Sequence, residues 1–512
     1  MKANDKTDEL GSTEQISVFH GRHEHAEYRR APISLYRGNP LVEALPNILT
    51  PKEARKLMAR YPEYDPADRT APAELRIHQM HTALNLFVPL PEHDSLEQRF
   101  SCLIRVGYVP RNPMQAGYWV NIDKRVKSLN GSIPVIPRSS STGMSIIGTS
   151  GGGKTTSVET VLQLYPQAIF HSQYEGRKFT SVQLVWLKMS CPHNGSVRAL
   201  CVNFFNMIDE ILGTNYHRAY AQGRRNSVDE MLPHMARVAA THHLGVLVID
   251  EIQHLNQSKS GGKEQMLNFF CELVNRIGLP VVFIGTYKAM PLLTEEFRQL
   301  RRGCGQGDFV WNRMTRGAKW NYFLETLWKY QYTAVPAPLT PELNEAIFDE
   351  TQGITDFAVK LFLLAQVRTI RTASSRQAEV ITPAIVHSVA LDSLRTAQPV
   401  IKALRHNDRA SLSQFSDVQP LDFSACVQQV IESTREDKRA KAGAKRPEVR
   451  PASPERQASS TSNLKMEPFE HDSEEIIVDV VKSASRNKGD VYAALQAAGI
   501  VRKASDLLQE DP

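Results

Sequence analysis

The chain has 512 residues, of which 41% are hydrophobic and 23% charged, and its formal net charge at pH 7 is +6. This composition is ordinary for a water-soluble globular protein, and the length predicts about three structural units. No apolar run approaches the roughly 20 residues of a membrane-spanning helix, which excludes a membrane partner. The six cysteines form no CxxC pair, so we expect free thiols in a reducing cytoplasm. The mild positive charge permits contact with nucleic acid without arguing for it.

The first part of the chain predicts a polar leader followed by helices. Residues 1–34 are polar and charged, and we expect them to be a disordered N-terminus. From residue 35 to about 130 the hydrophobic pattern favours a mainly helical module. Within it, Thr50-Pro51-Lys52-Glu53 is typical of a helix start, with Thr50 as N-cap, Pro51 at the first helical position and Glu53 completing a capping box.

The most informative motif is Gly148-Thr149-Ser150-Gly151-Gly152-Gly153-Lys154-Thr155, which matches G-x-x-x-x-G-K-[ST]. The apolar residues 144–147 predict a buried strand before it, and residues 156–162 predict a helix after it. Backbone N–H groups of such a loop bind phosphate oxygens, helped by the helix dipole. Lys154 is expected to reach the β- and γ-phosphates, and the Thr155 hydroxyl to ligate Mg²⁺.

A second apolar run, residues 245–249, ends in the carboxylates Asp250 and Glu251. Such a run suits a central parallel strand that is buried on both faces. Asp250 would hold Mg²⁺ through water, and Glu251 would act as the general base that orients a water molecule. The residues expected to bind the nucleotide are Gly148, Thr149, Ser150, Gly151, Gly152, Gly153, Lys154, Thr155, Thr156 and Asp250.

A third buried strand is predicted at residues 279–285 and ends at Thr286, whose hydroxyl could contact the attacking water or the γ-phosphate. The three strands together predict an α/β fold with a doubly wound parallel sheet, and a nucleotide at the carboxyl edge of that sheet.

The region after residue 335 predicts helices and then a tail. Thr340-Pro341 and Thr382-Pro383 are helix starts, and Gly353 is a helix stop between them. Residues 431–468 have the composition of a flexible linker. Residues 469–512 regain helical patterning but hold more acidic than basic residues, which argues against DNA reading by this tail.

One motif is judged a coincidence. Asn487-Lys488-Gly489-Asp490 matches the guanine-reading NKxD of GTPases, but it lies outside the phosphate-loop domain and follows no buried strand. We therefore expect ATP rather than GTP.

Taken in order, GTSGGGKTT, LVIDEIQHL and VVFIGTYKA resemble AAA+ ATPases of the TnsC/TniB type, which regulate DNA transposition. The length and the added tail are more like TnsC. Further segments similar to that family are residues 88–93, 107–113, 183–188 and 301–308. The resemblance implies an AAA+ core at residues 131–335, a helical lid at 336–430 and a partner-docking tail at 469–512.

The resemblance also implies a function in a bacterial cytoplasm. The protein would form a ring or filament on duplex DNA without sequence specificity, and it would recruit transposase or endonuclease subunits together with a target-selector protein. ATP hydrolysis would drive disassembly. In this family a neighbouring subunit completes the site, and Arg301 and Arg302 lie where such an arginine finger belongs, as does Arg298. Many lids carry an arginine near the glycine, but here Asp356 and Lys360 stand in that region.

Basic residues with a nearby tyrosine suit non-specific contact with DNA phosphates, and no sequence-reading motif is visible. The candidates are Arg177, Lys178, Lys188, Arg218, Arg224 and Arg225. Three alternatives remain open: a DnaC- or IstB-like loader ATPase, a scaffold that binds ATP with negligible turnover, and a signalling NTPase without a nucleic-acid partner.

Overall fold

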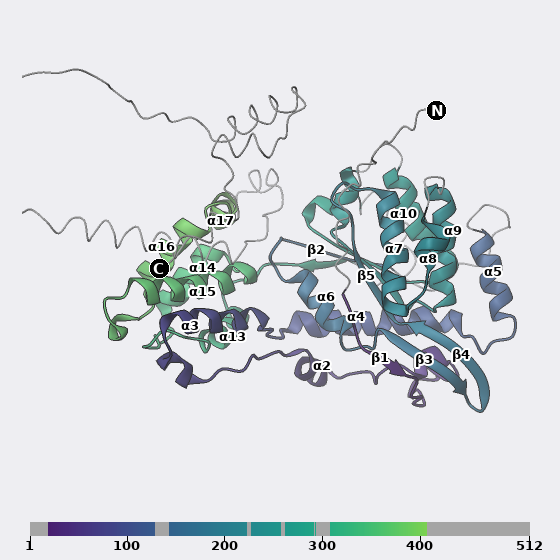
Figure 1. Cartoon of the computed structure of the whole chain (residues 1–512), viewed down its shortest axis with the longest axis horizontal. Coiled ribbons are helices and arrows are strands. Elements are labelled where there is room, and N and C mark those ends of the chain that lie inside the picture. The colour runs from purple at the N-terminus through teal and green to yellow at the C-terminus, as the bar shows by residue number, and fades with distance from the viewer. Residues whose placement is uncertain are drawn as a thin grey trace, which may run out of the picture. The chain divides into compact units, whose positions relative to one another are not determined.

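The computed structural model describes residues 19–128, 143–222, 227–257, 262–290, 292 and 308–406. The chain divides into two compact units, residues 1–444 and 445–512, and all of the described residues belong to the first. Figure 1 shows a sheet with helices on its faces, together with a second group of helices that follows it in the chain.

The core is a five-stranded parallel sheet with the strand order β5-β6-β7-β2-β8. In chain order its strands are β2 (Met144–Gly148), β5 (Trp186–Ser190), β6 (Val246–Asp250), β7 (Val281–Gly285) and β8 (Asp308–Trp311). Every residue of β2, β6 and β7 is buried, as their unbroken apolar runs predict. The doubly wound parallel sheet is therefore confirmed, and β7 separates the strand of the phosphate loop from the strand of the acid pair.

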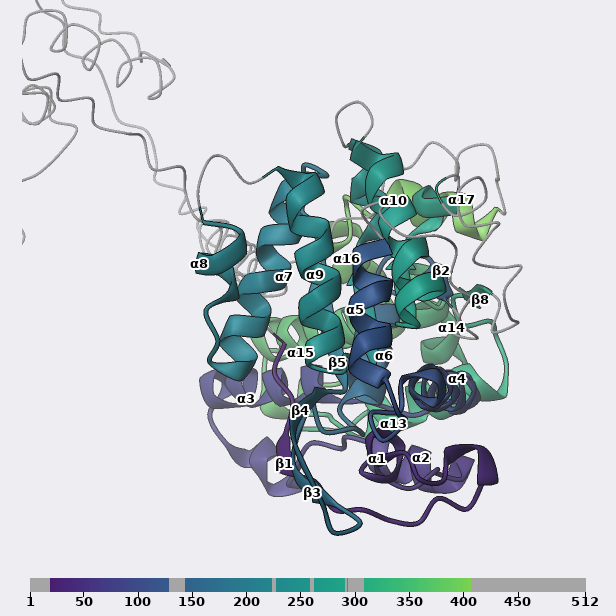
Figure 2. The ribbon, with the colours of Figure 1, turned by 90° about the vertical axis from the view of Figure 1, so that its right-hand side faces the viewer.

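Helices cover both faces of this sheet. Leu247 and Ile249 of β6 share one hydrophobic core with α5 (Tyr118–Ser128), α7 (Val197–Leu212), α9 (Val228–Thr241) and α10 (Gly262–Glu272), which Figure 2 shows lying together. Val246 and Val248 point to the opposite face, where they share a core with α4 (Pro91–Tyr108) and α6 (Lys154–Leu162). This alternation follows from the two-residue period of a strand.

A small second sheet has the order β1-β3-β4, with β1 (His23–His25), β3 (Ala168–Tyr174) and β4 (Arg177–Leu184). The prediction of disorder throughout residues 1–34 is wrong for residues 19–34, and residues 1–18 lie outside the described residues. β1 pairs in parallel with β3, and the Phe19 ring lies 5.3 Å from the Trp186 ring. The order comes from these partners far along the chain, because the segment itself has no apolar alternation.

The N-terminal helices divide between two cores. The predicted capping box at Thr50 is confirmed: the Thr50 N–H donates to Glu53 Oε2 at 2.8 Å, and the Glu53 N–H donates to Thr50 Oγ1 at 3.4 Å. The helices are α1 (Pro40–Glu43), α2 (Pro51–Met58) and α3 (Ala73–Met80), followed by α4 and α5. Apolar residues of α4 pack on the sheet, whereas Ile77 and Met80 of α3 lie in the core of the C-terminal helices.

The C-terminal helices form a separate hydrophobic core. They are α13 (Ala318–Trp328), α14 (Pro341–Thr351), α15 (Thr355–Thr372), α16 (Pro383–Ser393) and α17 (Gln398–Arg405). Thr340 and Thr382 cap α14 and α16 as predicted, each with proline at the start of the helix. Residues 407–512, with the predicted linker and docking tail, lie outside the described residues.

Shorter elements complete the described chain. They are α8 (Tyr216–Tyr220), a π-helical turn at Leu273–Ile277, and 3-10 helices at Ser34–Tyr36, Pro66–Thr70, His81–Asn85, Val109–Arg111, Ile252–Gln257, Tyr287–Ala289 and Arg376–Ala378. Among the helices of the described part, none combines the length and apolarity needed to cross a membrane.

Candidate nucleotide site

The phosphate loop connects β2 to α6. Gly151 and Gly153 have φ angles of +73° and +86°, a left-handed conformation that glycine adopts without strain. Gly153 is the residue before the first turn of α6, so the loop delivers the chain into a helix whose first N–H groups have no helical partner. Those groups and the helix dipole form an anion-binding site of the kind that phosphate requires.

Lys154 and Thr155 begin α6 and face the strand edge. The buried Lys154 ammonium donates to the carbonyl oxygens of Gly148 at 3.1 Å and Thr149 at 2.7 Å, so it lies within the curve of the loop. The Thr155 hydroxyl donates to Asp250 Oδ2 at 2.9 Å. The fold thus brings together the hydroxyl and the carboxylate that the sequence analysis assigned to one metal ion, although they lie 95 residues apart.

The acid pair ends β6, with Asp250 buried and Glu251 partly buried. Glu251 has a left-handed φ of +53°, and its N–H donates to Asp250 Oδ1 at 2.9 Å. Gln253 donates its side-chain N–H to Glu251 Oε2, while its Oε1 accepts the Thr286 N–H at 3.2 Å. Gln253 therefore links the predicted general base to the end of β7. Sequence reasoning missed this residue, because a glutamine two positions after an acid pair has no recognisable pattern.

These groups line one cavity of about 620 Å³, a size that suits a small-molecule ligand. Loop residues 150–156, Asp250, Glu251 and Thr286 form its polar part. Its apolar part comes from residues before α4 and from the C-terminal helices: Leu86, Phe87, Val88, Phe323 and Phe357. A cavity lined both by a phosphate loop with polar side chains and by apolar side chains suits a nucleotide, which combines phosphates with an aromatic ring.

The residues fit a magnesium ion. Mg²⁺ prefers oxygen ligands, keeps several waters and is commonly held by one or two protein groups together with substrate phosphates. The Thr155 hydroxyl and the Asp250 carboxylate supply such oxygens next to the loop, and the Thr155–Asp250 hydrogen bond shows that both side chains turn toward the same point.

Two further residues hold the loop from outside it. His93 lies between the Phe87 and Trp311 rings, accepts the Leu90 N–H at Nδ1 and has Nε2 3.0 Å from Ser157 Oγ on α6. Burial lowers the pKa of His93 to about 4, so the ring is neutral at pH 7. Trp311 Nε1 donates to the Gly152 carbonyl at 2.6 Å. The sequence carried no signal for Trp311, because a single tryptophan far from the loop has no recognisable pattern.

The start of α15 contacts the loop directly. The Asp356 N–H donates to the Gly151 carbonyl at 3.1 Å, and the Thr355 hydroxyl donates to the same oxygen at 3.2 Å. Lys360 forms an ion pair with Asp356 at 2.8 Å, so the two charged residues expected near the lid glycine neutralise each other.

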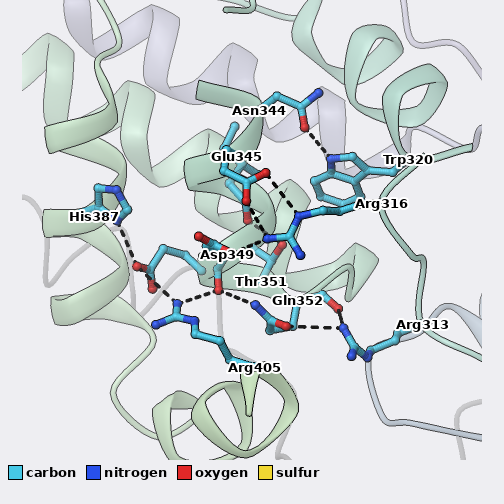
Figure 3. Close-up of polar contacts among 12 residues, drawn as sticks. Arg313, Arg316, Trp320, Asn344, Glu345, Asp349, Thr351, Gln352, His387 and Arg405 are labelled. Carbon is cyan, nitrogen blue, oxygen red and sulfur yellow. Dashed lines mark hydrogen bonds and ion pairs between the residues drawn. The ribbon is translucent and has the colours of Figure 1, made fainter. Parts of the chain in front are cut away.

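An arginine does reach this cavity, but from the segment after β8. Arg313 lines the cavity and donates to the Gln352 carbonyl at 2.8 Å, beside the end of α14 (Figure 3). Its neighbour Arg316 binds Glu345 at 2.7 Å and Asp349 at 2.6 Å on the exposed side. The sequence holds no signal for Arg313, because the resemblance places such an arginine near Gly353, on the helix that follows it.

The DNA candidates lie in different places. Arg177 and Lys178 are exposed just after the turn of the β3–β4 hairpin, where Glu175 and Gly176 both have positive φ. Arg218 is exposed on α8, which Figures 1 and 2 show apart from the hairpin tip. Arg224 and Arg225 lie outside the described residues, as do the predicted finger residues Arg298, Arg301 and Arg302.

Lys188 corrects one of these predictions. Instead of facing solvent, its side chain is 9% exposed and its ammonium lies 2.9 Å from Glu159 and 3.4 Å from Asp250. A lysine that is buried and paired in this way is not presented to DNA.

Comparison with known protein families finds a match over the part of the chain that contains the phosphate loop and the acid pair. A family model described as an AAA domain matches residues 138–293, which contain the loop, the acid pair and Thr286. No curated protein matches the chain. With the observed sheet, this match identifies a parallel-sheet α/β P-loop core of the AAA+ type.

Several solved structures are similar at low identity. The Orc1 protein of Aeropyrum pernix in complex with DNA is 14% identical with a TM-score of 0.32, covering 65% of this chain and 87% of its own. The Orc2 protein of that organism, with ADPNP and ADP, is 13% identical with a TM-score of 0.32, covering 64% and 96%. A Walker-type ATPase of Pyrococcus abyssi is 12% identical with a TM-score of 0.31, covering 60% and 87%. These values are too low to carry an argument about function.

Proposed function

We propose that this protein binds ATP with Mg²⁺ and hydrolyses it to ADP and phosphate. The observation that carries the proposal is the convergence of the phosphate loop, the acid pair, Thr286 and the start of α15 on one cavity. The AAA-domain match over residues 138–293 supports the same chemistry.

Each residue then has a role. Lys154 and the loop N–H groups, from residues 148–156, hold the phosphates, and Thr155 and Asp250 hold Mg²⁺, Asp250 through water. Glu251 takes the proton of the attacking water, and Thr286 contacts that water or the γ-phosphate. Arg301 and Arg302 of a neighbouring subunit would stabilise the charge that develops on the γ-phosphate.

Two substitutions test the chemistry. Glu251→Gln keeps the size of the side chain, so we expect unchanged nucleotide affinity and phosphate release slower by ~10²–10⁴, the range for losing a general base. Lys154→Ala removes a cation that contacts the phosphates, so we expect binding itself to weaken. Phosphate release at the same rate in Glu251→Gln and in the unmodified protein would refute the role of Glu251.

We further propose that the protein is a bacterial, cytoplasmic regulator of DNA transposition that assembles as a ring or filament on duplex DNA. The support is the resemblance of its motifs to TnsC, together with the exposed Arg177 and Lys178 on the hairpin. ATP would favour assembly and hydrolysis would reverse it, because the finger arginine comes from the neighbour. Residues 469–512 would dock transposase or endonuclease subunits, and a target selector would choose the site.

DNA binding is tested by gel shift at two salt concentrations with a non-hydrolysable ATP analogue. Arg177→Ala/Lys178→Ala should weaken binding to any duplex sequence and reduce the salt slope by up to about 2, one unit for each phosphate that is no longer neutralised. The matched control is Arg395→Ala/Lys402→Ala, which removes the same charge from exposed positions in the turn before α17 and on α17. Equal decreases in affinity in the two double variants would remove the hairpin from the DNA-binding surface.

Assembly is tested by electron microscopy of the protein with duplex DNA and by the dependence of turnover on protein concentration. Turnover per subunit that stays constant well below micromolar protein would contradict a site shared between subunits. A loader ATPase of the DnaC or IstB type would share the core without stimulating a transposase. Negligible phosphate release with and without DNA would instead identify an ATP-bound scaffold.

A further inference from the structure

A buried lysine lies beside the predicted metal ligand. Lys188 is the middle residue of β5 and lies opposite Val248 in the parallel register with β6. Its ammonium is 2.9 Å from Glu159 on α6 and 3.4 Å from Asp250 Oδ2, the oxygen that also accepts the Thr155 hydroxyl. The Phe19 ring lies 6.0 Å from the same nitrogen.

The position of Lys188 follows from the strand period. Trp186, Lys188 and Val248 share the sheet face that α6 covers, and Asp250 extends from the same face at the end of β6. A charged side chain that points from this face meets α6 and the strand end. Burial of an ammonium is costly unless it is paired, and Glu159 supplies the partner.

The charges of this cluster partly cancel. Lys188 contributes one positive charge, whereas Glu159 and Asp250 contribute one negative charge each, so the cluster as a whole carries the charge of a single carboxylate. Without Glu159, Lys188 would neutralise Asp250 and repel a divalent cation. Without Lys188, two carboxylates would face the cation together.

We propose that Lys188 and Glu159 act as an opposed pair that sets the affinity of the Thr155–Asp250 site for its divalent cation. This inference rests on the proposed function in one respect, namely that the site holds Mg²⁺ beside ATP. Lys188 lowers the affinity of this site for the cation, and Glu159 raises it again. At this intermediate affinity the metal binds together with the nucleotide and leaves when the nucleotide leaves.

Lys188 acts through its charge and not by orienting the Asp250 carboxylate. Both oxygens of Asp250 have other partners: the Thr155 hydroxyl donates to Oδ2 at 2.9 Å, and the Glu251 N–H donates to Oδ1 at 2.9 Å. Asp250 therefore keeps two hydrogen bonds when Lys188 is replaced by an uncharged residue. The two members of the pair should then have opposite effects on the metal, which a purely structural role would not produce.

The experiment measures how strongly Mg²⁺ improves binding of a fluorescent ATP analogue, as the ratio of its Kd in EDTA to its Kd in excess MgCl₂. We expect Lys188→Met to raise this ratio by about tenfold and Glu159→Gln to lower it by about tenfold, the size of one nearby unit charge in a partly screened site. The double variant should return to within about threefold of the unmodified protein, since it restores the net charge.

Two further variants, Lys188→Arg and Asp250→Asn, make the test decisive. Lys188→Arg keeps the charge and should change the ratio by less than about threefold. Glu159→Gln keeps the size of a partly exposed side chain and is expected to fold. A fall of the ratio in both single variants, or no change in either, would overturn the proposal. Asp250→Asn separates it from its premise: a ratio unchanged by that substitution would refute the metal site itself.

Discussion

A buried ion pair connects the N-terminal helix α3 to the C-terminal helices, and its removal tests how much that contact stabilises the protein. Arg76 binds Glu379 through two hydrogen bonds of 2.6 and 3.0 Å, and the side chains are 2% and 6% exposed. The guanidinium also donates to the carbonyl oxygens of Tyr332 and Ala71. The substitution Arg76→Met removes all of these donors and supplies no other.

We expect Arg76→Met to lower the free energy of unfolding strongly. Removal of one partner from a buried pair leaves the other charge without compensation, at a cost of about 3–5 kcal/mol. Burial alone would raise the pKa of Glu379, but hydrogen bonds from Arg76 and the Ala334 N–H hold that pKa below its usual value. An unfolding entropy of about 2 cal/mol/K per residue gives about 1 °C for each kcal/mol in the unit formed by residues 1–444, so Arg76→Met should lower Tm by roughly 3–5 °C.

Arg316 offers a matched control. It makes ion pairs of 2.7 and 2.6 Å with Glu345 and Asp349, but its side chain is 53% exposed (Figure 3). Exposed pairs contribute about 0–1 kcal/mol, so Arg316→Met should lower Tm by about 1 °C at most. Differential scanning calorimetry of the two variants compares the same substitution in two environments. Equal shifts in Tm would refute the argument that burial decides the contribution.

Three other predictions concern acid, catalysis and the loop. Burial lowers the pKa of three histidines, to about 4 in His93 and His171 and to about 3 in His243. The unfolded chain binds these protons near pH 6.5, whereas the folded chain does not, so Tm should fall as the pH decreases from about 6.5 toward 4. A Tm independent of pH in that window would contradict the burial of neutral imidazoles. Gln253→Leu breaks the link between Glu251 and Thr286. Steady-state kinetics should therefore show kcat reduced by roughly 10–10²-fold with nucleotide Kd unchanged, as expected for a misplaced base. Weaker nucleotide binding with unchanged kcat would assign Gln253 to binding. Trp311→Phe removes the donor to the Gly152 carbonyl. A nucleotide titration should show an affinity lower by about fivefold, equivalent to one hydrogen bond of ~1 kcal/mol. An unchanged affinity would show that the phosphate loop keeps its shape without this hydrogen bond.

The sheet and the phosphate loop could be predicted from the sequence because their determinants are local. An apolar run bounded by glycine and an acid specifies a buried strand, and β2, β6 and β7 lie where those runs are. The capped helix starts at Thr50, Thr340 and Thr382 are equally local, since each cap bonds to a residue within three positions. The AAA-domain match covers the same stretch of chain as the three strands.

The errors concern residues whose environment comes from far along the chain. A lysine in a strand reads as exposed, because an unpaired charge is rarely buried. Lys188 is buried because Glu159, on a helix that precedes the strand, reaches across to it. The same holds for Arg313, which precedes Gly353 by 40 residues and is brought to Gln352 only by the path of the chain after β8.

The order of the strands explains why the end of β7, with Thr286, contributes to the site besides the phosphate loop and the acid pair. If β6 lay next to β2, the acid pair would border the phosphate loop directly, with no group between them at the sheet edge. Because β7 lies between them, its exit at Thr286 falls between the phosphate loop and Glu251, the proposed general base. Gln253 then bonds to both sides of this junction, to Glu251 and to the Thr286 N–H. Because β7 pairs with both neighbours, with Val282 opposite Met144 of β2 and Phe283 opposite Ile249 of β6, a displacement of β7 would move the phosphate loop and the acid pair together.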